Sequence, residues 1–555
     1  MVTNFFRNGR LLLLRRQTNI LSAAFVIMVA YAASGLLGLV RNRLLAATFF
    51  SGREAELDVY FAAFVIPDTL FQLLVIGALS AAFIPVFSHE LKKGEEAASR
   101  LASAAITVIT IAFLVFITII FLASKHFAFL IAPSLEPDKT VLLSQLLRIM
   151  LIAQIFFTLS GFLTAVIQSH QRFLIPALAP IAYNFGIITG IIVLTPSMGI
   201  FGAAIGVVIG SFLHLVIQIP LARKLGFRYR FSLDFRHPGV QEIRKLMPPR
   251  SLTLVIGQAE RFIAVFIATA LHAGSLTIFN FARQLYLLPV TLFGTAIGQA
   301  SFPTLSAEIA SEKREEFQKT VQSSLLQVLY LSLPAAVILL ILRVPVVRIA
   351  FGARNFPWEA TLLTGKTVAL LSISIPTQSI VGVLTRAFYA THDTKTPLAT
   401  GTISAITTAI LSIVLTRVMG FGVVGLALAL SLASLLQAIS LLILLNRKVK
   451  VMTPSFLFPM GKMIVATMVT GVFLWLPMRL IDSFILDTTK TINLIILTTS
   501  VVAIGVLVYL NLSAVLHLEQ LTEVIALGRR IGNWKEILKK SEEVLETPGI
   551  EESTS

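Results

Sequence analysis

The residues most able to do chemistry in this chain are charged side chains inside strongly apolar stretches. Residues 34–50 read SGLLGLVRNRLLAATFF, which places Arg41 and Arg43 two positions apart in a run apolar enough to lie in a bilayer. An arginine at membrane depth costs between about 2.5 and 17 kcal/mol, so such residues face a bundle interior or an aqueous cavity. The pattern therefore predicts a polar site inside a membrane-embedded bundle.

Further ionisable residues share this setting, and most of their charge is positive. Arginine offers bidentate donors to phosphate oxygens, so a cationic cavity suits an anionic substrate, phosphate or pyrophosphate above all. The residues expected to line a substrate-binding cavity are Arg41, Arg43, Asp58, Arg148, Arg261, Arg283 and Gln284. The residues expected to form ion pairs or to couple transport to an ion are Asp68, Glu260, Lys366 and Arg386.

Helix geometry limits which of these side chains share a face. Arg41 and Arg43 point about 200° apart on a regular helix, so at most one of them faces the cavity and the other reaches an interface or a neighbouring helix. Arg283 lies between the polar Asn280 and Gln284, which favours a wet surface. Asp58 and Lys366 lie near expected span ends, where an interfacial position is an equal alternative.

Catalytic and metal-binding signatures are absent from the sequence. The chain has no cysteine, and it contains no Walker A, Gly-x-Ser-x-Gly or His-Glu-x-x-His motif. Its eight histidines do not cluster at metal-ligand spacing. We therefore expect a transporter rather than an enzyme, with no cofactor; coupling to the membrane potential or to a monovalent ion stays open.

The composition predicts an all-α polytopic membrane protein. Hydrophobic residues make up 56% of the 555 residues and charged residues only 13%, against about 25% in ordinary soluble domains. A basic tail, residues 1–19, runs directly into the first of about fourteen expected transmembrane helices. These lie near 20–50, 56–88, 98–124, 140–168, 173–195, 200–224, 241–271, 275–304, 318–350, 359–390, 397–416, 421–446, 456–480 and 491–512.

The loop charges predict the orientation of these spans. Loops after even-numbered spans carry clusters of lysine and arginine, as at Lys92 and Lys93, whereas loops after odd-numbered spans are short or poor in them. Positive charge marks cytoplasmic loops, so both termini are expected on the cytoplasmic side of a bacterial inner membrane. Positive-inside charge also explains most of the net charge of +17 without a nucleic-acid partner.

An internal repeat divides the chain. GFLTAVIQSHQRFLIP from Gly161 matches GVLTRAFYATHDTKTP from Gly382 at an offset of 221 residues, which covers an even number of spans. Parallel repeats of this kind place the substrate site between the copies. We therefore expect two pseudo-symmetric six-helix lobes, 20–224 and 241–446, joined by a cytoplasmic linker, 225–240. Two further helices follow in 456–512, then a cytoplasmic amphipathic and disordered tail, 513–555.

Several motifs resemble one known family. The stretch LVRNRLLAATFFSGREAELDVYFAAFVIPDTLFQLLVIGALSAAFIPVFS at 39–88 is similar to the amino-terminal signature of the MurJ (MviN) lipid II flippases, which belong to the multidrug/oligosaccharidyl-lipid/polysaccharide exporter superfamily. MPPRSLTLVIGQ at 247–258 and LYLLPVTLFGTAIGQASFPTLS at 285–306 resemble later motifs of that family. The resemblance implies alternating access that carries undecaprenyl-pyrophosphate-linked peptidoglycan precursor from the cytoplasmic to the outer leaflet. It also implies membrane-lipid partners and contacts with cell-wall synthesis or division proteins.

The resemblance also identifies individual positions. Arg41 matches a family cavity arginine, and Asp58 matches a family acid in the second helix. This chain departs from the pattern at Asn42, where an acid is usual, and at Gln284, where arginine is usual and Arg283 stands one place earlier. It also departs at Gly35 and at Phe71 and Gln72, where many members have arginine, and at Ala264, a site that is often acidic. Either displaced arginines supply the missing charge, or the substrate is another lipid-linked oligosaccharide or a solute. A non-transporting cell-envelope scaffold is the alternative from a different class.

Overall fold

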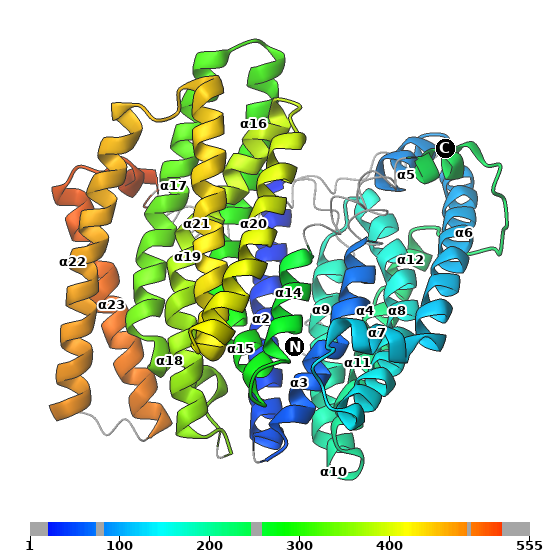
Figure 1. The fold of residues 1–555 in the computed structure, drawn as a ribbon. Helices are drawn as coiled ribbons and strands as arrows, with labels where there is room; N and C mark the ends of the chain where they lie inside the picture. Colours follow the sequence, from blue (N-terminus) through cyan, green and yellow to red (C-terminus); the bar gives the residue numbers. More distant parts are fainter. Residues whose placement is uncertain are drawn as a thin grey trace, which may run out of the picture.

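The protein folds into two helical lobes that stand side by side (Figure 1). The computed structural model describes residues 20–50, 52–73, 83–245, 258–353, 355–484, 490–523 and 525. Within these ranges the regular structure is helical and contains no strand, as the composition predicts. The fold class expected from the sequence is therefore confirmed.

The amino-terminal lobe begins with one long helix and continues through shorter ones. Its helices are α2 (Ile20–Phe49), α3 (Glu54–Ala63), α4 (Val65–Phe71), α5 (Ile84–Leu91), α6 (Glu95–Leu122), α7 (Ser124–Ile131), α8 (Pro137–Ser169), α9 (Leu174–Thr189), the π-helix η2 (Gly190–Leu194), α10 (Thr195–Met198), α11 (Ile200–Val216) and α12 (Ile219–Lys224). In Figure 1, α6 and α12 lie at the outer flank of this lobe, and α2 and α3 lie beside the other lobe.

The carboxy-terminal lobe follows the same plan, with two additional helices on its far flank. It contains α14 (Ala259–Ala268), α15 (Ser275–Pro289), the π-helix η3 (Val290–Thr295), α16 (Ala296–Ala310), α17 (Arg314–Ile341), α18 (Arg343–Phe351), α19 (Trp358–Ala390), α20 (Lys395–Ile413), the π-helix η4 (Val414–Val418) and α21 (Gly422–Val449). The additional pair is α22 (Pro454–Phe484), which packs on α17, and α23 (Thr491–Val515).

The helix bounds repeat at the offset found in the sequence. The helices α8 and α19 are each 33 residues long and begin at Pro137 and Trp358, 221 positions apart. Their neighbours α6 and α17 are each 28 residues long. Each lobe also carries a short π-helix after its next long helix, η2 in one and η4 in the other. The two lobes are thus two copies of one arrangement.

Eleven helical stretches in the described ranges are long and apolar enough to cross a membrane. They correspond to eleven of the fourteen expected spans, with ends that differ by a few residues. The second and seventh expected spans include 74–82 and 246–257, which lie outside the described residues. The first expected span corresponds to the helix α2, which is not among the eleven stretches. The count of fourteen therefore stays a prediction. The tails 1–19 and 526–555 also lie outside the description.

Small residues allow α9 and α11 to pack backbone against backbone. A Cβ atom added at Gly186 would lie 2.3 Å from the Cα of Gly210, and one added at Gly190 would lie 2.4 Å from that of Gly206. Real Cβ atoms do not approach so closely, so these positions require glycine. Gly206 and Gly210, four residues apart on α11, therefore form a tight interface with α9, as small residues do in other membrane bundles.

Candidate functional site

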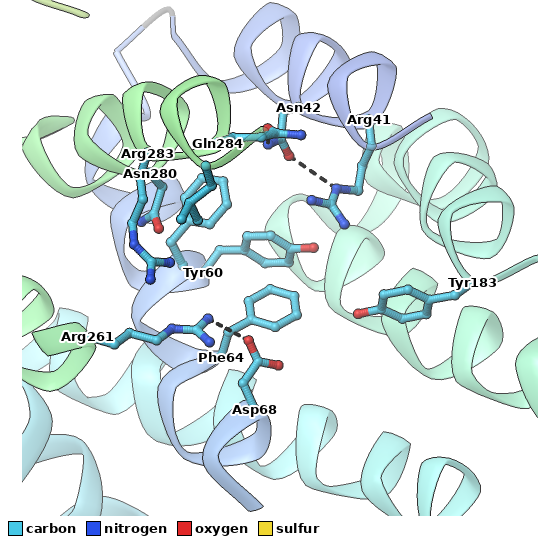
Figure 2. Close-up of a pocket in the computed structure, with 12 residues that line it drawn as sticks. Arg41, Asn42, Tyr60, Phe64, Asp68, Tyr183, Arg261, Asn280, Arg283 and Gln284 are labelled. Carbon is cyan, nitrogen blue, oxygen red and sulfur yellow. Dashed lines mark hydrogen bonds and ion pairs between the residues drawn. The ribbon is translucent and has the colours of Figure 1, made fainter. Parts of the chain in front are cut away.

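A polar cavity of about 330 Å³ lies where the two lobes meet. The side chains around it come from α2, α3, α4 and α9 on one side and from α14 and α15 on the other (Figure 2). They are Arg41, Asn42, Tyr60, Phe61, Phe64, Asp68, Tyr183, Arg261, Asn280, Arg283, Gln284 and Leu287. Three arginines and one carboxylate thus line a single space. The cavity combines positive charge with aromatic walls.

Arg41 is held in place by two asparagine side chains. Its Nε donates to Oδ1 of Asn42 at 3.1 Å, and its Nη1 donates to Oδ1 of Asn184 at 3.2 Å. Asn184 is buried on α9, and its amide donates in turn to Ser34 and to the backbone oxygen of Pro180. Amide oxygens orient a guanidinium without neutralising it. Arg41 therefore keeps its full positive charge in the cavity.

The other two arginines come from the carboxy-terminal lobe. Arg261 forms an ion pair with Asp68 of the opposite lobe, with Nη2 and Oδ2 2.5 Å apart. Arg283 lies partly buried next to Asn280, and within the described residues it has no hydrogen-bond or ion-pair partner. One arginine is thus neutralised by Asp68, whereas Arg41 and Arg283 are free to attract an anion.

Two of the departures from the family pattern, Asn42 and Gln284, contact each other. Nδ2 of Asn42 donates to Oε1 of Gln284, across the seam between α2 and α15. The resemblance places an acid and an arginine at these two positions, so a neutral amide pair replaces an oppositely charged pair. The exchange removes one charge of each sign. At these two positions alone it leaves the net charge unchanged.

Asp58 does not line this cavity, contrary to the prediction. It is buried on α3, and its carboxylate accepts hydrogen bonds from the backbone N–H groups of Gly274 and Thr277 at 2.7 and 2.8 Å, and from the Thr277 hydroxyl at 2.6 Å. Gly274 precedes α15 and has no side chain to cap that helix. Asp58 thus supplies the cap from the other lobe, where a carboxylate favours the positive end of the helix.

Arg43 is also absent from the cavity and fastens the lobes instead. Its Nη1 donates to the backbone oxygen of Ile349 in α18 at 2.8 Å. Nearby, Asn355 donates to the backbone oxygen of Ala47 at 2.8 Å. Arg43, Ala47 and Asp58, together with their partners Gly274, Thr277, Ile349 and Asn355, form what we call the interlobe clamp.

An aromatic cluster reinforces the clamp. Phe50 at the end of α2 packs edge-on against Phe356 at 4.7 Å between ring centroids, and Phe281 stacks on Phe351 at 4.4 Å. All four rings are nearly or fully buried. Along α2, Arg41 precedes Arg43 and Ala47, and along the chain Asp68 follows Asp58. The clamp therefore closes the end of the cavity nearest the turn between α2 and α3, which the loop charges predict to be the outer side.

The remaining predicted residues lie elsewhere. Arg148 does not line the cavity; its Nε donates to Oγ of Ser124 and to the backbone oxygen of Phe121, where α6 ends and α7 begins. Arg386 donates to the backbone oxygen of Gly382 in its own helix at 2.8 Å. Lys366 is exposed, and Glu260 is partly buried beside the cavity residue Arg261 without lining the cavity itself. Only Asp68 of this second group lines the cavity.

Sequence reasoning missed the aromatic and amide residues of the site. Tyr60, Phe64 and Tyr183 form its walls, and Asn184 orients Arg41. Aromatic residues are common throughout membrane spans, so the residue type alone did not indicate that these three line a cavity. Asn184 stands in the apolar run PALAPIAYNFGIITG, where an isolated amide would have been a usable indication. Among the described residues no group of three or more His, Asp or Glu side chains could hold a metal ion.

Comparison with known proteins decides the family. The family model described as "Lipid II flippase MurJ" matches residues 45–497. The chain belongs to the MurJ lipid II flippase family. It is 29% identical to the probable lipid II flippase MurJ of Thermotoga maritima over 503 residues, which cover 89% of this chain and 96% of the relative. It is 25% identical to the lipid II flippase MurJ of Burkholderia cenocepacia over 439 residues, which cover 78% and 84%.

A solved structure of a MurJ protein has the same fold. The structure described as "Lipid II flippase MurJ, inward closed conformation" superposes with a TM-score of 0.74 at 25% identity, and the match covers 88% of this chain and 98% of that one. A structure described as the inward-facing conformation of a multidrug resistance MATE family transporter of the MOP superfamily matches with a TM-score of 0.63 at 13% identity, which supports the fold alone. The chain is therefore a multi-pass membrane transporter of the MurJ family.

Proposed function

We propose that this protein is a lipid II flippase that carries undecaprenyl-pyrophosphate-linked peptidoglycan precursor from the cytoplasmic to the outer leaflet. Membership of the MurJ family supports the substrate class, and the cavity arginines support a pyrophosphate group as the part that is recognised. The observation that carries the proposal is the convergence of Arg41, Arg261 and Arg283 from two lobes on one cavity.

The cavity chemistry suits a pyrophosphate. Arg41 and Arg283 are not neutralised by a carboxylate, and guanidinium groups bind phosphate oxygens with two parallel N–H donors. Arg261 can exchange Asp68 for a phosphate, because the Asp68 carboxylate and a phosphate group are alternative anionic partners for the same guanidinium N–H donors. The volume of about 330 Å³ is at the small end of ligand sites. The cavity therefore matches the pyrophosphate group in size, rather than the whole disaccharide pentapeptide.

The position of the cavity suits alternating access. Both lobes contribute to it, and the interlobe clamp fastens them on one side of it. Opening toward the clamp side requires loss of the Asp58 and Arg43 hydrogen bonds. Repeat-built transporters rock one lobe against the other about a site of this kind. In this proposal the clamp holds the outer side closed while substrate enters from the cytoplasm.

The membrane potential is a sufficient driving force for this direction. Moving an anion outward across an inside-negative membrane gains about 2.3 kcal/mol per charge per 100 mV. A pyrophosphate group that crosses with its charges uncompensated would gain a few kcal/mol. The proposal therefore needs no ATP, in keeping with the absence of a Walker A motif from the sequence.

A second candidate is the export of another lipid-linked oligosaccharide, with the same cavity. The observation that favours it is the neutral Asn42–Gln284 pair, because a contact changed in this way alters the hydrogen-bonding pattern beside the substrate. Contacts with cell-wall synthesis or division proteins remain a prediction from the family resemblance.

Complementation tests the proposal. A bacterium depleted of its own MurJ should grow when it carries this protein, and should stop growing when the protein carries Arg41→Ala or Arg283→Ala at equal membrane abundance. Growth with every variant would remove the assigned roles of the arginines and leave flipping intact. No growth with the wild-type protein, although it reaches the membrane, would favour a different substrate or a non-transporting scaffold.

A further inference from the structure

The linker between the lobes contains an extended segment with an unusual alternation of side chains. Residues 227–236 read FRYRFSLDFR, so that every second residue is apolar and the residues between them include three arginines. The segment has no helix, begins after a short turn that follows α12, and ends in a turn at Phe235 and Arg236. In extended backbone, successive side chains point to opposite sides. This segment, which we call the linker ribbon, therefore has one apolar edge and one cationic edge.

Backbone hydrogen bonds hold the linker ribbon along α6. The hydroxyl groups of Ser99, Ser103 and Thr107, one turn apart on that helix, accept the N–H groups of residues 228, 230 and 232 at 3.3, 3.1 and 3.5 Å. The hydroxyl groups of Tyr229 and Thr107 are also hydrogen-bonded, at 3.0 Å. The backbone of the linker ribbon is thus fixed to this row of three hydroxyl groups on α6, which we call the polar track. It runs from the start of α6 toward the middle of that helix.

The side chains on the apolar edge are exposed, although the backbone is fixed. The exposed fractions are 51% for Tyr229, 69% for Phe231, 50% for Leu233 and 52% for Phe235. Only Phe227, at the start of the ribbon, is buried. Four large apolar side chains within seven residues form a patch of the kind that marks a partner or a membrane.

The track continues directly into the lipid-facing surface of α6. One turn beyond Thr107, the helix exposes Ile111, followed by Val115 and Ile119, within the 28-residue stretch that is apolar enough to span a membrane. The linker ribbon therefore lies at the border between this span and the aqueous phase. Aromatic residues gather at that level in membrane proteins, because their rings suit the headgroup region.

A cavity of about 680 Å³ opens between the linker ribbon, α12 and the end of α8. It is lined by Leu163, Ile219, Ala222, Arg223, Phe227, Arg228 and Tyr229. Two guanidinium groups thus face an apolar space, and none of its lining residues is acidic. The one acid within the ribbon, Asp234, accepts the N–H of Arg236 at 3.0 Å. The cavity has the charge and the apolar floor that suit an anionic lipid headgroup and the start of its acyl chains.

We propose that the linker ribbon and this cavity form an interfacial site for an anionic phospholipid of the adjacent leaflet. Arg223 and Arg228 bind the headgroup phosphate, and the side chains of Tyr229, Phe231, Leu233 and Phe235 enter the boundary between headgroups and acyl chains. The site anchors the outer flank of the amino-terminal lobe, far from the substrate cavity. A protein partner would also suit the apolar edge, but the cationic cavity beside a lipid-facing helix favours a lipid.

Native mass spectrometry of the purified full-length protein tests the headgroup assignment. Phosphatidylglycerol and phosphatidylcholine are titrated in parallel onto the wild-type protein, onto the double variant Arg223→Gln/Arg228→Gln and onto the control double variant Arg447→Gln/Lys450→Gln. The control removes the same charge from the exposed carboxy-terminal end of α21 in the other lobe. We expect about thirtyfold weaker binding of phosphatidylglycerol to the first variant only. Equal affinities of the three proteins, or no preference for phosphatidylglycerol, would overturn the proposal.

A spin label tests the membrane insertion independently of lipid affinity. The chain has no cysteine, so Phe231→Cys introduces a single thiol for a nitroxide, and Ser311→Cys in the loop between α16 and α17 is the aqueous control. In phosphatidylglycerol bilayers we expect the label at position 231 to collide with oxygen several times more than the control, and less with a water-soluble nickel complex. The same accessibility at both positions would place the ribbon in water and overturn the proposal.

Binding of purified lipid II, but not phosphatidylglycerol, to the arginine pair would assign the site to the substrate and overturn the proposal as well.

Discussion

The substrate cavity and the interlobe clamp are both made of polar side chains between the same two lobes, yet their partners differ. In the clamp, Asp58 and Arg43 bind backbone groups and the Thr277 hydroxyl of the opposite lobe at 2.6 to 2.8 Å. In the cavity, Arg41 is oriented by asparagine side chains of its own lobe, and Arg283 has no partner within the described residues. Both charged side chains of the clamp therefore have hydrogen-bond partners in the opposite lobe, whereas Arg41 and Arg283 of the cavity have none there among the described residues.

The difference separates a structural role from a binding role. A buried charge that is satisfied by backbone groups holds two elements together, and its loss leaves polar groups unpaired. A charge without an anionic partner in a cavity is available for a ligand. The residue type alone does not distinguish the two, because Arg41 and Arg43 are two positions apart on one helix. What distinguishes them is the surface each one faces.

Removal of a cavity arginine should have the largest effect. Arg283→Ala deletes a cation with no protein partner, so we expect the rate of lipid II translocation to fall about tenfold to a hundredfold while the protein stays folded. Arg283→Lys should recover part of the rate, because it restores charge without the bidentate geometry. The control is Arg417→Ala, which removes an exposed arginine in η4, the π-helix after α20. A rate equal to the wild type for Arg283→Ala would place the binding charge elsewhere.

Loss of the cap at α15 should change the position of the lobes rather than the affinity of the cavity. Asp58→Asn removes the negative charge that accepts three hydrogen bonds, an expected cost of about 1–3 kcal/mol for the clamped state. Nitroxide labels at Glu54→Cys and Ala273→Cys, on the two sides of the clamp, should show a larger population of longer distances. A matched control is Asp393→Asn, because Asp393 caps α20 within one lobe through Thr396. A distance distribution unchanged by Asp58→Asn would show that the clamp does not hold the lobes.

The sequence predicted the fold and part of this comparison. The 33-residue helices α8 and α19 begin at the offset of the repeat, and of Arg41 and Arg43 only Arg41 lines the cavity, as their angular separation predicts. Asp58 was assigned to the cavity wrongly, because its partners lie more than 200 residues away, at 274 and 277. Arg148 was misplaced for a related reason, since its partners Phe121 and Ser124 lie on the preceding helices, more than 20 residues away. Tertiary neighbours, rather than local pattern, determine these roles.

A smaller effect is expected for the second member of the clamp. Arg43→Gln shortens the side chain and removes the hydrogen bond to the Ile349 oxygen, with an expected cost of about 1 kcal/mol to the clamped state. The same label pair should therefore show a smaller shift than for Asp58→Asn, and translocation should change by a few-fold at most. A loss of translocation as large as that of Arg283→Ala would mean that Arg43 contacts substrate and that the comparison is wrong.

The smallest effect is a pH dependence confined to one lobe. Lys448, whose Nζ lies 2.6 Å from Oδ2 of Asp393, and Thr396 lower the pKa of Asp393 below its ordinary value. The ion pair therefore stabilises the fold above pH of about 4, and the contribution is lost as the pH falls through the lowered pKa. Lys448 is half exposed, so we expect less than about 1 kcal/mol. The Tm of the wild type should exceed that of Asp393→Asn at pH 7, and the difference should narrow below about pH 4 without a change in lobe distance.

Translocation of lipid II by the purified protein tests the central claim most directly. Proteoliposomes with fluorescent lipid II in one leaflet are compared with and without an imposed potential, for the wild type and for the double variant Arg41→Ala/Arg283→Ala. We predict transfer by the wild type that accelerates when the potential drives the anion across, and transfer by the variant close to that of protein-free liposomes. Equal rates for the wild type and the variant would contradict the cationic cavity as the path, and rates independent of potential would contradict the proposed driving force.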